Sequence, residues 1–372
     1  MTVPSRDALP SLTGLRFWAA LLVVLYHLSR QVGEVPGLTP LVWYGRTGVT
    51  FFFVLSGFVL AWTYEGARLP VTVFYRRRFA RIWPLHLVTT ALSVALYLLL
   101  SAEVSVTAVA ASLPLMQAWH PALAKGGNPA AWSLSDEAWF YALFPGLLAL
   151  LAARGNRLLR RAGATAVLAL PLAWLCGALV VSPAVRSWLL DYLPLTRSAQ
   201  FVLGVVCALA VKRGGRPPLS LPAAAVAVLA WHTALIPWHA ALPDSAWYGP
   251  YNASQLLSAP LFAALIAAAA HRDVQGLPTG LRGTWLLRLG RWSFAWYLVH
   301  ELVLRLFLHL YGRTAPGWPS LVVWLVLALA SQALAGLLYA LVERPAESWL
   351  RSRGSVPRRA GRSGADRLSW NP

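Results

Sequence analysis

The chain has 372 residues, of which 58% are hydrophobic and only 12% are charged. Soluble domains carry about 25% charged residues, so this composition excludes an ordinary soluble protein. The formal net charge of +19 would suit a nucleic-acid-binding protein. However, the arginines fall between apolar runs and not in one basic domain, so we expect no nucleic acid partner. Apolar runs of about 20 residues recur along the chain and can each span a bilayer. We therefore predict an all-α, polytopic transmembrane helical bundle.

These runs predict about ten membrane-spanning helices. We place them near residues 12–30, 48–64, 79–100, 135–153, 163–182, 197–212, 219–237, 251–270, 290–310 and 318–342. The segment 104–120 is apolar but shorter, which favours a re-entrant or interfacial piece. With both termini in the cytosol, most basic residues face inward, and the outer half keeps Arg30, Arg46, Lys125, Arg186, Arg197, Arg305 and Arg313. This asymmetry follows the positive-inside rule, and we predict a multi-pass protein of the cell membrane.

The domain organisation is simple. Residues 1–343 form one transmembrane domain in this interpretation. Residues 344–372 are rich in Arg, Ser, Gly and Pro, which predicts a basic, disordered cytosolic tail near anionic lipid. Cys176 and Cys207 lie in apolar segments and indicate neither a disulfide framework nor a metal site.

The first predicted span carries Arg16 near its start and His27 near its end. Eleven residues separate them, which places both on nearly the same helix face, about 16 Å apart along the axis. A titratable pair inside an apolar segment is costly unless it faces protein or water, so it indicates a functional site. The alternative is that Arg16 extends to one interface and His27 lies near the opposite headgroups.

Basic residues follow the second span, in the stretch FYRRRFARIWPLH. Arg78 and Arg81 are three apart and share a helix face, and Arg76 and Arg77 add positive charge. Guanidinium groups bind phosphate in a bidentate manner, so a phosphorylated cosubstrate could dock here. The alternative is simple anchoring of the helix on the positive inner side.

Two later stretches also place polar residues in apolar surroundings. In WSLSDEAWFYALFP, Ser133 and Glu137 share a helix face next to Trp132 and could orient a polyol acceptor or pair with a buried cation. An aromatic interfacial belt with solvated acids is the alternative. In LGRWSFAWYLVHE, His300 lies near the middle of the membrane, and Glu301 could pair with Arg305. The small residues Ser56-Gly57 in FFFVLSGFVLAW favour close packing of helices.

Several common catalytic sites are excluded. The chain contains no G-x-x-x-x-G-K-[ST] phosphate loop and no G-x-S-x-G nucleophile elbow. His300-Glu301 begins like a zinc-protease motif, but Leu304 stands at the position of the second histidine. ATP-driven and zinc-hydrolytic functions are therefore unsupported.

Together these stretches resemble the acyltransferase family 3 membrane proteins, which acylate hydroxyls of cell-surface sugars and of some natural products. The resemblance runs from Leu12 to Glu343, nearly the whole chain. The matching elements are LTGLRFWAALLVVLYHL with its arginine and histidine, FFFVLSGFVLAW, the R-x-x-R element at Arg78 and Arg81, WSLSDEAWFY with Glu137 at the usual glutamate, LGRWSFAWYLVH ending at His300, and ERP at 343–345. The second acid that commonly follows the glutamate is Ala138 here. The chain resembles the stand-alone form without a fused hydrolase-like domain.

The resemblance implies an enzyme that uses cytosolic acyl-CoA, commonly acetyl-CoA, as cosubstrate and needs no metal. The acceptor is then a hydroxyl of a carbohydrate or another small molecule, and membrane lipids surround the protein. The implied catalytic residues are His27 as general base, Arg16 and Glu137, with Glu137 or another acid orienting the imidazole or the acceptor. The implied CoA-binding residues are Arg77, Arg78 and Arg81, and the acceptor-binding residues are Trp132, Ser133 and His300. Direct transfer and an acyl-histidine intermediate both remain open.

Two alternatives belong to other functional classes. A transporter could use Arg16, His27, Glu137 and His300 as a proton or substrate relay, although the chain shows no paired halves with broken helices. A non-catalytic membrane scaffold would tolerate replacement of all four residues. For an enzyme, a surface polysaccharide, peptidoglycan or a secreted metabolite would each be a compatible acceptor.

Overall fold

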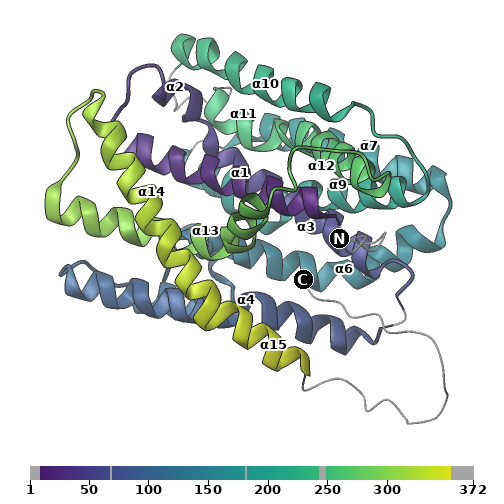
Figure 1. The fold of residues 1–372 in the computed structure, drawn as a ribbon, viewed down its shortest axis with the longest axis horizontal. Coiled ribbons are helices and arrows are strands. Elements are labelled where there is room, and N and C mark those ends of the chain that lie inside the picture. The colour runs from purple at the N-terminus through teal and green to yellow at the C-terminus, as the bar shows by residue number, and fades with distance from the viewer. Residues whose placement is uncertain (1–8, 68, 181, 243–248, 353–372) are drawn as a thin grey trace.

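The computed structural model describes residues 9–67, 69–180, 182–242 and 249–352 (Figure 1). All regular elements in these ranges are helical. The α-helices are α1 (Pro10–His27), α2 (Thr39–Val42), α3 (Gly48–Tyr64), α4 (Val71–Leu99), α5 (Val106–Ser112), α6 (Trp132–Ala153), α7 (Asn156–Cys176), α8 (Pro183–Ser187), α9 (Pro194–Lys212), α10 (Leu221–Ala241), α11 (Pro250–Leu257), α12 (Ala259–Val274), α13 (Thr284–Tyr311), α14 (Pro319–Leu338) and α15 (Arg344–Ser352). The protein is an all-α polytopic helical bundle.

Within the described ranges, nine helical stretches are long and apolar enough to cross a membrane. They are Pro10–Val32, Thr39–Tyr64, Val71–Leu99, Pro129–Ala153, Asn156–Cys176, Pro183–Lys212, Leu221–Ala241, Pro250–Val274 and Pro319–Leu350. The predicted span 290–310 corresponds to α13, which has 28 residues but is not among the nine. This helix carries His300, Glu301 and Arg305 and packs against α1 and α14. His300 and Glu301 are buried inside the bundle, whereas the Arg305 side chain is partly exposed.

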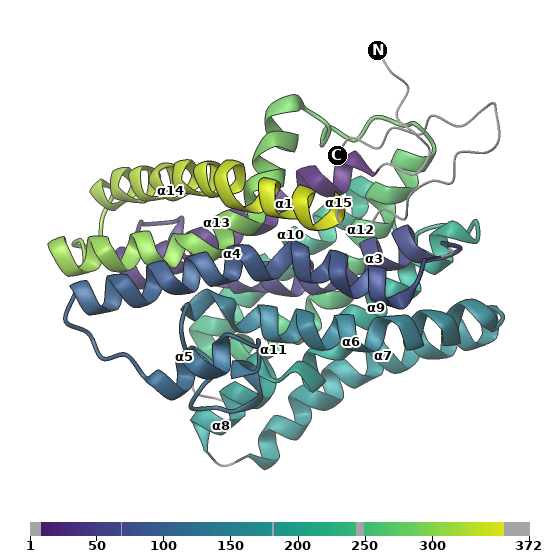
Figure 2. The same ribbon diagram turned by 90° about the horizontal axis from the view of Figure 1, so that it is seen from below.

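The segment between α4 and α6 contains no helix that is long enough by itself to cross a membrane, as its short apolar run predicted. It contains the seven-residue α5 (Figure 2) and two 3-10 turns, Gln117–Trp119 and Pro129–Ala131. Two boundaries differ from prediction. Helix α4 begins at Val71, directly after Pro70, so the basic stretch belongs to its first turns. Helix α7 runs from Asn156 to Cys176, earlier in the chain than the predicted span 163–182.

Glycines allow the inner helices to approach each other closely. A Cβ atom at Gly57 of α3 would overlap the carbonyl of Phe201 on α9, and one at Gly204 of α9 would overlap the carbonyl of Val54. The close packing predicted for the Ser56-Gly57 pair is thus confirmed. Gly290 of α13 makes the same kind of contact with the backbone of α1. This contact holds α13 against α1, which carries Arg16 and His27.

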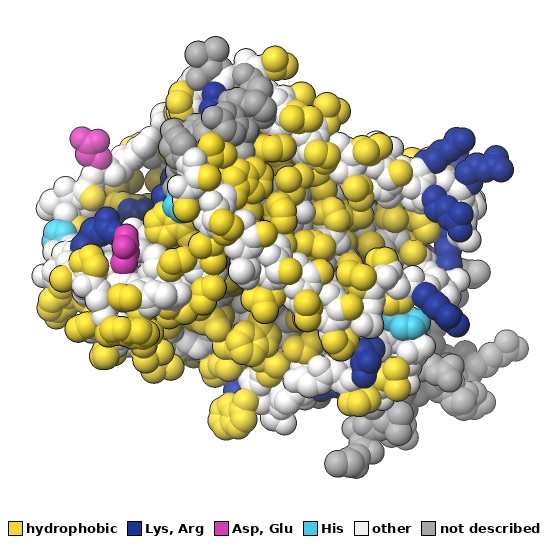
Figure 3. Space-filling view, turned by 90° about the horizontal axis from the view of Figure 1, so that it is seen from above, with side chains coloured by type: hydrophobic (Ala, Val, Ile, Leu, Met, Phe, Trp, Pro, Cys, Tyr) yellow, Lys and Arg dark blue, Asp and Glu magenta, His cyan; other side chains and the backbone are white. Residues whose placement is uncertain are grey.

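The outer surface fits a protein surrounded by lipid. Figure 3 shows a broad apolar face, with Lys and Arg side chains gathered along one edge. Many large apolar side chains are exposed, among them Leu168 on α7, Leu229 on α10 and Leu329 on α14. Such exposed apolar area is unusual for a soluble monomer and expected for a membrane protein.

The C-terminal prediction needs one correction. Residues 344–352 form helix α15, which packs against α4, so this part of the predicted tail is helical (Figure 1). The turn that leads into α15 buries Glu343 beside Arg81 of α4, and this ion pair fixes the start of the helix. Residues 353–372 of the predicted tail lie outside the described residues. The first half of α1 and the start of α15 lie at the same end of the bundle, because Arg16 and Glu343 lie close enough to interact electrostatically.

Candidate active site

Two histidines from distant parts of the sequence meet inside the bundle. His27 is the last residue of α1, and His300 lies in the middle of α13. Nε2 of His300 lies 3.2 Å from Nδ1 of His27, and the ring centroids are 4.8 Å apart. His300 is fully buried, whereas the His27 side chain keeps 22% of its surface exposed. His27 is therefore the imidazole of this pair that a bound substrate can reach.

Glu301 of α13 contacts the other nitrogen of His27. Its Oε1 lies 3.0 Å from Nε2 of His27 and accepts a hydrogen bond from Nε2 of Gln31 at 3.1 Å. Gln31 reaches Glu301 because the chain continues after α1 as a π-helical turn, Leu28–Val32. Oε2 of Glu301 forms an ion pair with Nε of Arg305 at 3.4 Å, which confirms the pair expected from their spacing. A carboxylate held against an imidazole orients the ring and stabilises its protonated form.

The hydrogen-bond partners define where protons lie in this cluster. Nδ1 of His300 lies 2.7 Å from the Tyr297 carbonyl oxygen, which can only accept, so this nitrogen carries hydrogen. Nε2 of a neutral His300 is then an acceptor. Nδ1 of His27 lies between that atom and the Val23 carbonyl oxygen, 2.9 Å away, and therefore also carries hydrogen. The lone pair of a neutral His27 is then on Nε2, facing Glu301. When the carboxyl is ionised, this contact is where the pair can take up one further proton, between Nε2 of His27 and Oε1 of Glu301.

The predicted arginines form a second cluster, near the start of α1. Arg81 of α4 is ion-paired with the buried Glu343, and its Nη1 lies 3.6 Å from Oε2 of Glu347 on α15. Arg16 of α1 interacts electrostatically with both Arg81 and Glu343. Arg78 lies one turn before Arg81 on the same helix. The structure thus brings Arg16 close to Arg78 and Arg81, which come from a distant part of the sequence.

Glu137 belongs to this arginine cluster and not to the histidine pair. Its Oε2 accepts a hydrogen bond from the Tyr141 hydroxyl at 3.1 Å, and the cations acting on its carboxylate are Arg81, Arg16 and Arg78. The sequence predicted that Glu137 or another acid orients the imidazole or the acceptor. In the structure the acid at the imidazole is Glu301, and Glu137 compensates the buried positive charge.

The remaining predicted site residues are Arg77, Trp132 and Ser133. Arg77 is half-buried on α4. The Trp132 ring, at the start of α6, packs edge-on against Tyr192, with centroids 4.8 Å apart. Ser133 is buried and hydrogen-bonds the Tyr297 hydroxyl. These α6 residues line the interior of the bundle, and Ser133 contacts the same helix that carries the histidine pair.

The sequence did not predict the contact between Glu301 and His27 because these two residues lie far apart in the chain. The spacing of Glu301 to Arg305 predicted only a local pair within one helix. The signal that could have identified it is its position directly after His300, since an acid beside a histidine within a membrane helix needs a compensating partner.

His27, His300 and Glu301 also form a set that could hold a metal ion. Their ligand atoms all lie within 4.8 Å of one another. Two imidazoles and one carboxylate are ligands that divalent transition metals accept. The same atoms also form the hydrogen bonds described above. A chelator would abolish the activity of a metal site, whereas it would leave a metal-free hydrogen-bonded cluster unchanged.

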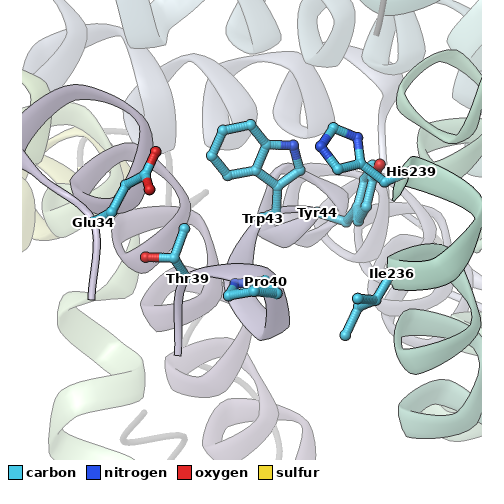
Figure 4. A pocket seen from close by; sticks show the side chains of 7 residues that line it. All are labelled: Glu34, Thr39, Pro40, Trp43, Tyr44, Ile236 and His239. Carbon is cyan, nitrogen blue, oxygen red and sulfur yellow. The ribbon is translucent and has the colours of Figure 1, made fainter. Parts of the chain in front are cut away.

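A cavity of about 200 Å³ lies at the end of the bundle beyond His27 (Figure 4). Its wall includes Glu34, Trp43, Tyr44 and His239. Arg30 connects this wall to α1, because its guanidinium lies 4.3 Å from the Trp43 ring centroid and 5.8 Å from that of Tyr26. The Tyr26 ring in turn lies 4.8 Å from the His27 ring. A continuous series of side chains thus leads from the cavity to the histidine pair.

Comparison with known proteins identifies the family of the chain. The Acyl_transf_3 family model, described as an acyltransferase domain, matches residues 9–340. The chain is 37% identical to acyltransferase MdmB of Streptomyces mycarofaciens, over 95% of both chains. It is also 38% identical over 94 residues to protein 2 in the picA locus of Rhizobium radiobacter, a match that covers 24% of this chain and 46% of that protein. No solved structure matches the chain significantly. On the family match and the full-length relative, the chain belongs to acyltransferase family 3.

Proposed function

We propose that this protein is an O-acyltransferase of the plasma membrane that transfers an acyl group, in the first instance acetyl, from cytosolic acyl-CoA to a hydroxyl of a carbohydrate or glycosylated metabolite. The observation that carries this proposal is the contact of 3.0 Å between Nε2 of His27 and Glu301. It creates an oriented, partly exposed base inside a membrane bundle. The acyltransferase relative that matches along its full length supports the reaction type.

The arginine cluster supports the choice of an acyl-CoA donor. Arg16, Arg78 and Arg81 lie at the end of the bundle opposite His27, and guanidinium groups bind nucleotide phosphates well. Arg16 and His27 are about 16 Å apart along α1. A long, thin pantetheine arm can bridge that distance and bring its thioester to the imidazole. With both termini in the cytosol, the arginine end faces the compartment that contains acyl-CoA.

The hydrogen-bond arrangement around His27 supports a base-catalysed transfer. His27 takes the proton from the acceptor hydroxyl as its oxygen attacks the thioester carbonyl, so a C–O bond forms and the C–S bond breaks. The His27–Glu301 pair then gives one proton to the departing CoA thiolate, and its own proton content is unchanged after the cycle. Positioned bases of this kind contribute about 10²–10⁴-fold to the rate. His300 lies behind His27 and holds the ring in place by their shared hydrogen bond.

The test uses the purified protein in detergent with acetyl-CoA and a panel of acceptors that includes surface polysaccharide, peptidoglycan fragments and glycosylated metabolites. We expect release of free CoA and ester formation with one acceptor class, and a loss of about 10²-fold or more in His27→Ala. Full activity of that variant would contradict the assignment of His27. Matched melting temperatures of the two proteins serve as the control for folding.

A further inference from the structure

The turn that follows α1 is a π-helix, Leu28–Val32, and it begins directly after His27. In such a turn the backbone hydrogen bonds join residues five apart, and the amide of Gly33 donates accordingly to the Leu28 carbonyl oxygen. π-helical turns are rare and often occur at functional sites. Gln31 lies in this turn, four residues after His27. The turn thus places an amide side chain close to the proposed base.

Gln31 and His27 meet at the same atom of Glu301. Nε2 of Gln31 donates a hydrogen bond to Oε1 at 3.1 Å, and Nε2 of His27 lies 3.0 Å from that oxygen. A carboxylate oxygen has two lone pairs. The Gln31 amide occupies one of them, which leaves the other for the imidazole. The hydrogen bond from Gln31 therefore fixes the direction from which Oε1 meets His27.

The chemistry of an amide is suited to this position. Gln31 donates a hydrogen bond but carries no charge, so the negative charge of Glu301 stays available to the imidazolium of His27. A lysine or arginine in its place would compete with the imidazolium for that charge. Arg305 does contact the same carboxylate, but at the opposite oxygen and with a partly exposed side chain. Oε1 therefore depends on Gln31 for its orientation more than on Arg305.

The turn that carries Gln31 is held in place from outside α1. The Val32 carbonyl oxygen accepts a hydrogen bond from the backbone amide of Thr314, which follows α13, at 2.8 Å. The Gly33 carbonyl oxygen accepts one from Nε1 of the buried Trp324 on α14, at 3.0 Å. A Cβ atom at Gly33 would overlap Oγ1 of Thr314. The chain that follows Glu301 thus also fixes the turn that reaches it.

A second polar side chain on the turn shows that the contact made by Gln31 is not required to satisfy the turn itself. The Ser29 hydroxyl donates to the Tyr26 carbonyl oxygen at 2.8 Å, so its hydrogen bond stays within the helix. The half-buried Gln31 instead crosses to α13. The two residues therefore allow a matched comparison of a local and an interhelical hydrogen bond.

We propose that Gln31 is a positioning residue, which aligns the Glu301 carboxylate on Nε2 of His27 through its hydrogen bond to Oε1. Gln31 acts on the base through Glu301 and does not itself touch the reacting atoms. This inference rests on the proposed acyltransferase function, in which His27 is the base, and it gives the π-helical turn after α1 a role in the reaction.

The experiment is a double-mutant cycle with the full-length protein in detergent, which follows CoA release at saturating acetyl-CoA with the acceptor class identified for the wild type. Gln31→Met keeps the length of the side chain and removes the donor. We expect kcat to fall about three- to tenfold, because one hydrogen bond is lost while the carboxylate stays, with KM for acetyl-CoA unchanged. In the Glu301→Gln background the same substitution should lower kcat by less than about twofold, because the charge that Gln31 aligns is already absent.

Ser29→Ala is the matched control, since it removes a hydrogen bond from the same turn without touching Glu301. We expect its kcat to stay within about twofold of wild type. If Gln31→Met does not fold, as judged by its melting temperature, Gln31→Ala provides the same comparison. Unchanged kcat in the Gln31 variant, an equal loss in Ser29→Ala, or the same factor with and without the Glu301 charge would overturn the positioning role.

A second measurement does not depend on turnover. Diethyl pyrocarbonate modifies unprotonated imidazole, and the tryptic peptide 17–30 contains His27 as its only histidine. A carboxylate aligned on the ring stabilises the protonated form. We therefore expect His27 to react at least about twofold faster in Gln31→Met than in wild type at neutral pH, and equal rates would contradict the alignment. No CoA release from the wild-type protein would instead contradict the proposed acyl transfer, and the labelling rates would still decide the role of Gln31.

Discussion

Replacing Glu301 by glutamine tests the proposed catalytic pair with a small change of shape. The glutamine keeps a carbonyl oxygen near Nε2 of His27, at the position now 3.0 Å away, but removes the negative charge that stabilises the imidazolium. A hydrogen bond to a charged group contributes about 1.5–3 kcal/mol, which corresponds to roughly 10- to 100-fold in rate. We therefore expect kcat of Glu301→Gln to fall by about that factor, with KM for acyl-CoA nearly unchanged because the arginine cluster is remote.

The assay follows CoA release at saturating donor in detergent, with the acceptor class identified for the wild type. Arg305→Gln is the matched control. Arg305 pairs with the opposite oxygen of the same carboxylate, but its side chain is 35% exposed, so solvent can replace it. We expect less than about threefold loss there. Full kcat in Glu301→Gln, or equal losses in both variants, would refute the argument that the carboxylate acts on His27.

Three further predictions concern other parts of the molecule. Glu347→Gln should lower KM for acyl-CoA roughly two- to fivefold, because Glu347 competes with phosphate for Arg81; a raised KM would mean that it positions the arginine. Gly57→Ala should lower the melting temperature through a clash with α9, whereas Gly146→Ala, where a Cβ meets nothing within 4 Å, should not; equal melting curves would contradict the close crossing. Excess EDTA should leave acyl transfer unchanged, and activity lost to EDTA but restored by zinc would identify the His27 cluster as a metal site.

Local patterns in the sequence predicted the parts of this protein that depend on a single helix. The spacing of Arg16 and His27, the length of the apolar runs and the weak 104–120 segment all follow from helical geometry and bilayer thickness. Glu301 and Arg305 are one turn apart, and the structure pairs them.

Contacts between helices could not be predicted from local sequence patterns. His27 and His300 are 273 residues apart, and their meeting depends on how α13 packs on α1. A glycine such as Gly290 permits two helices to pack closely, but the sequence around it does not specify which helix packs there. The same limit explains Glu137, whose spacing to Ser133 suggested a role at the acceptor, while packing places it among arginines from two other helices.

The two ends of α1 explain why an apolar helix retains charged and titratable residues. At one end, Arg16 lies near Arg78 and Arg81 and near the acids Glu137 and Glu343, which compensate this buried positive charge. At the other end, His27 is held by His300 and Glu301, which fix the ring and the proton on it. Because Arg16 and His27 belong to one helix, an acyl-CoA donor held by its phosphates at Arg16, as we propose, would present its thioester at a fixed distance from His27. Positioning of this kind is itself catalytic, since it removes the entropic cost of bringing donor and base together.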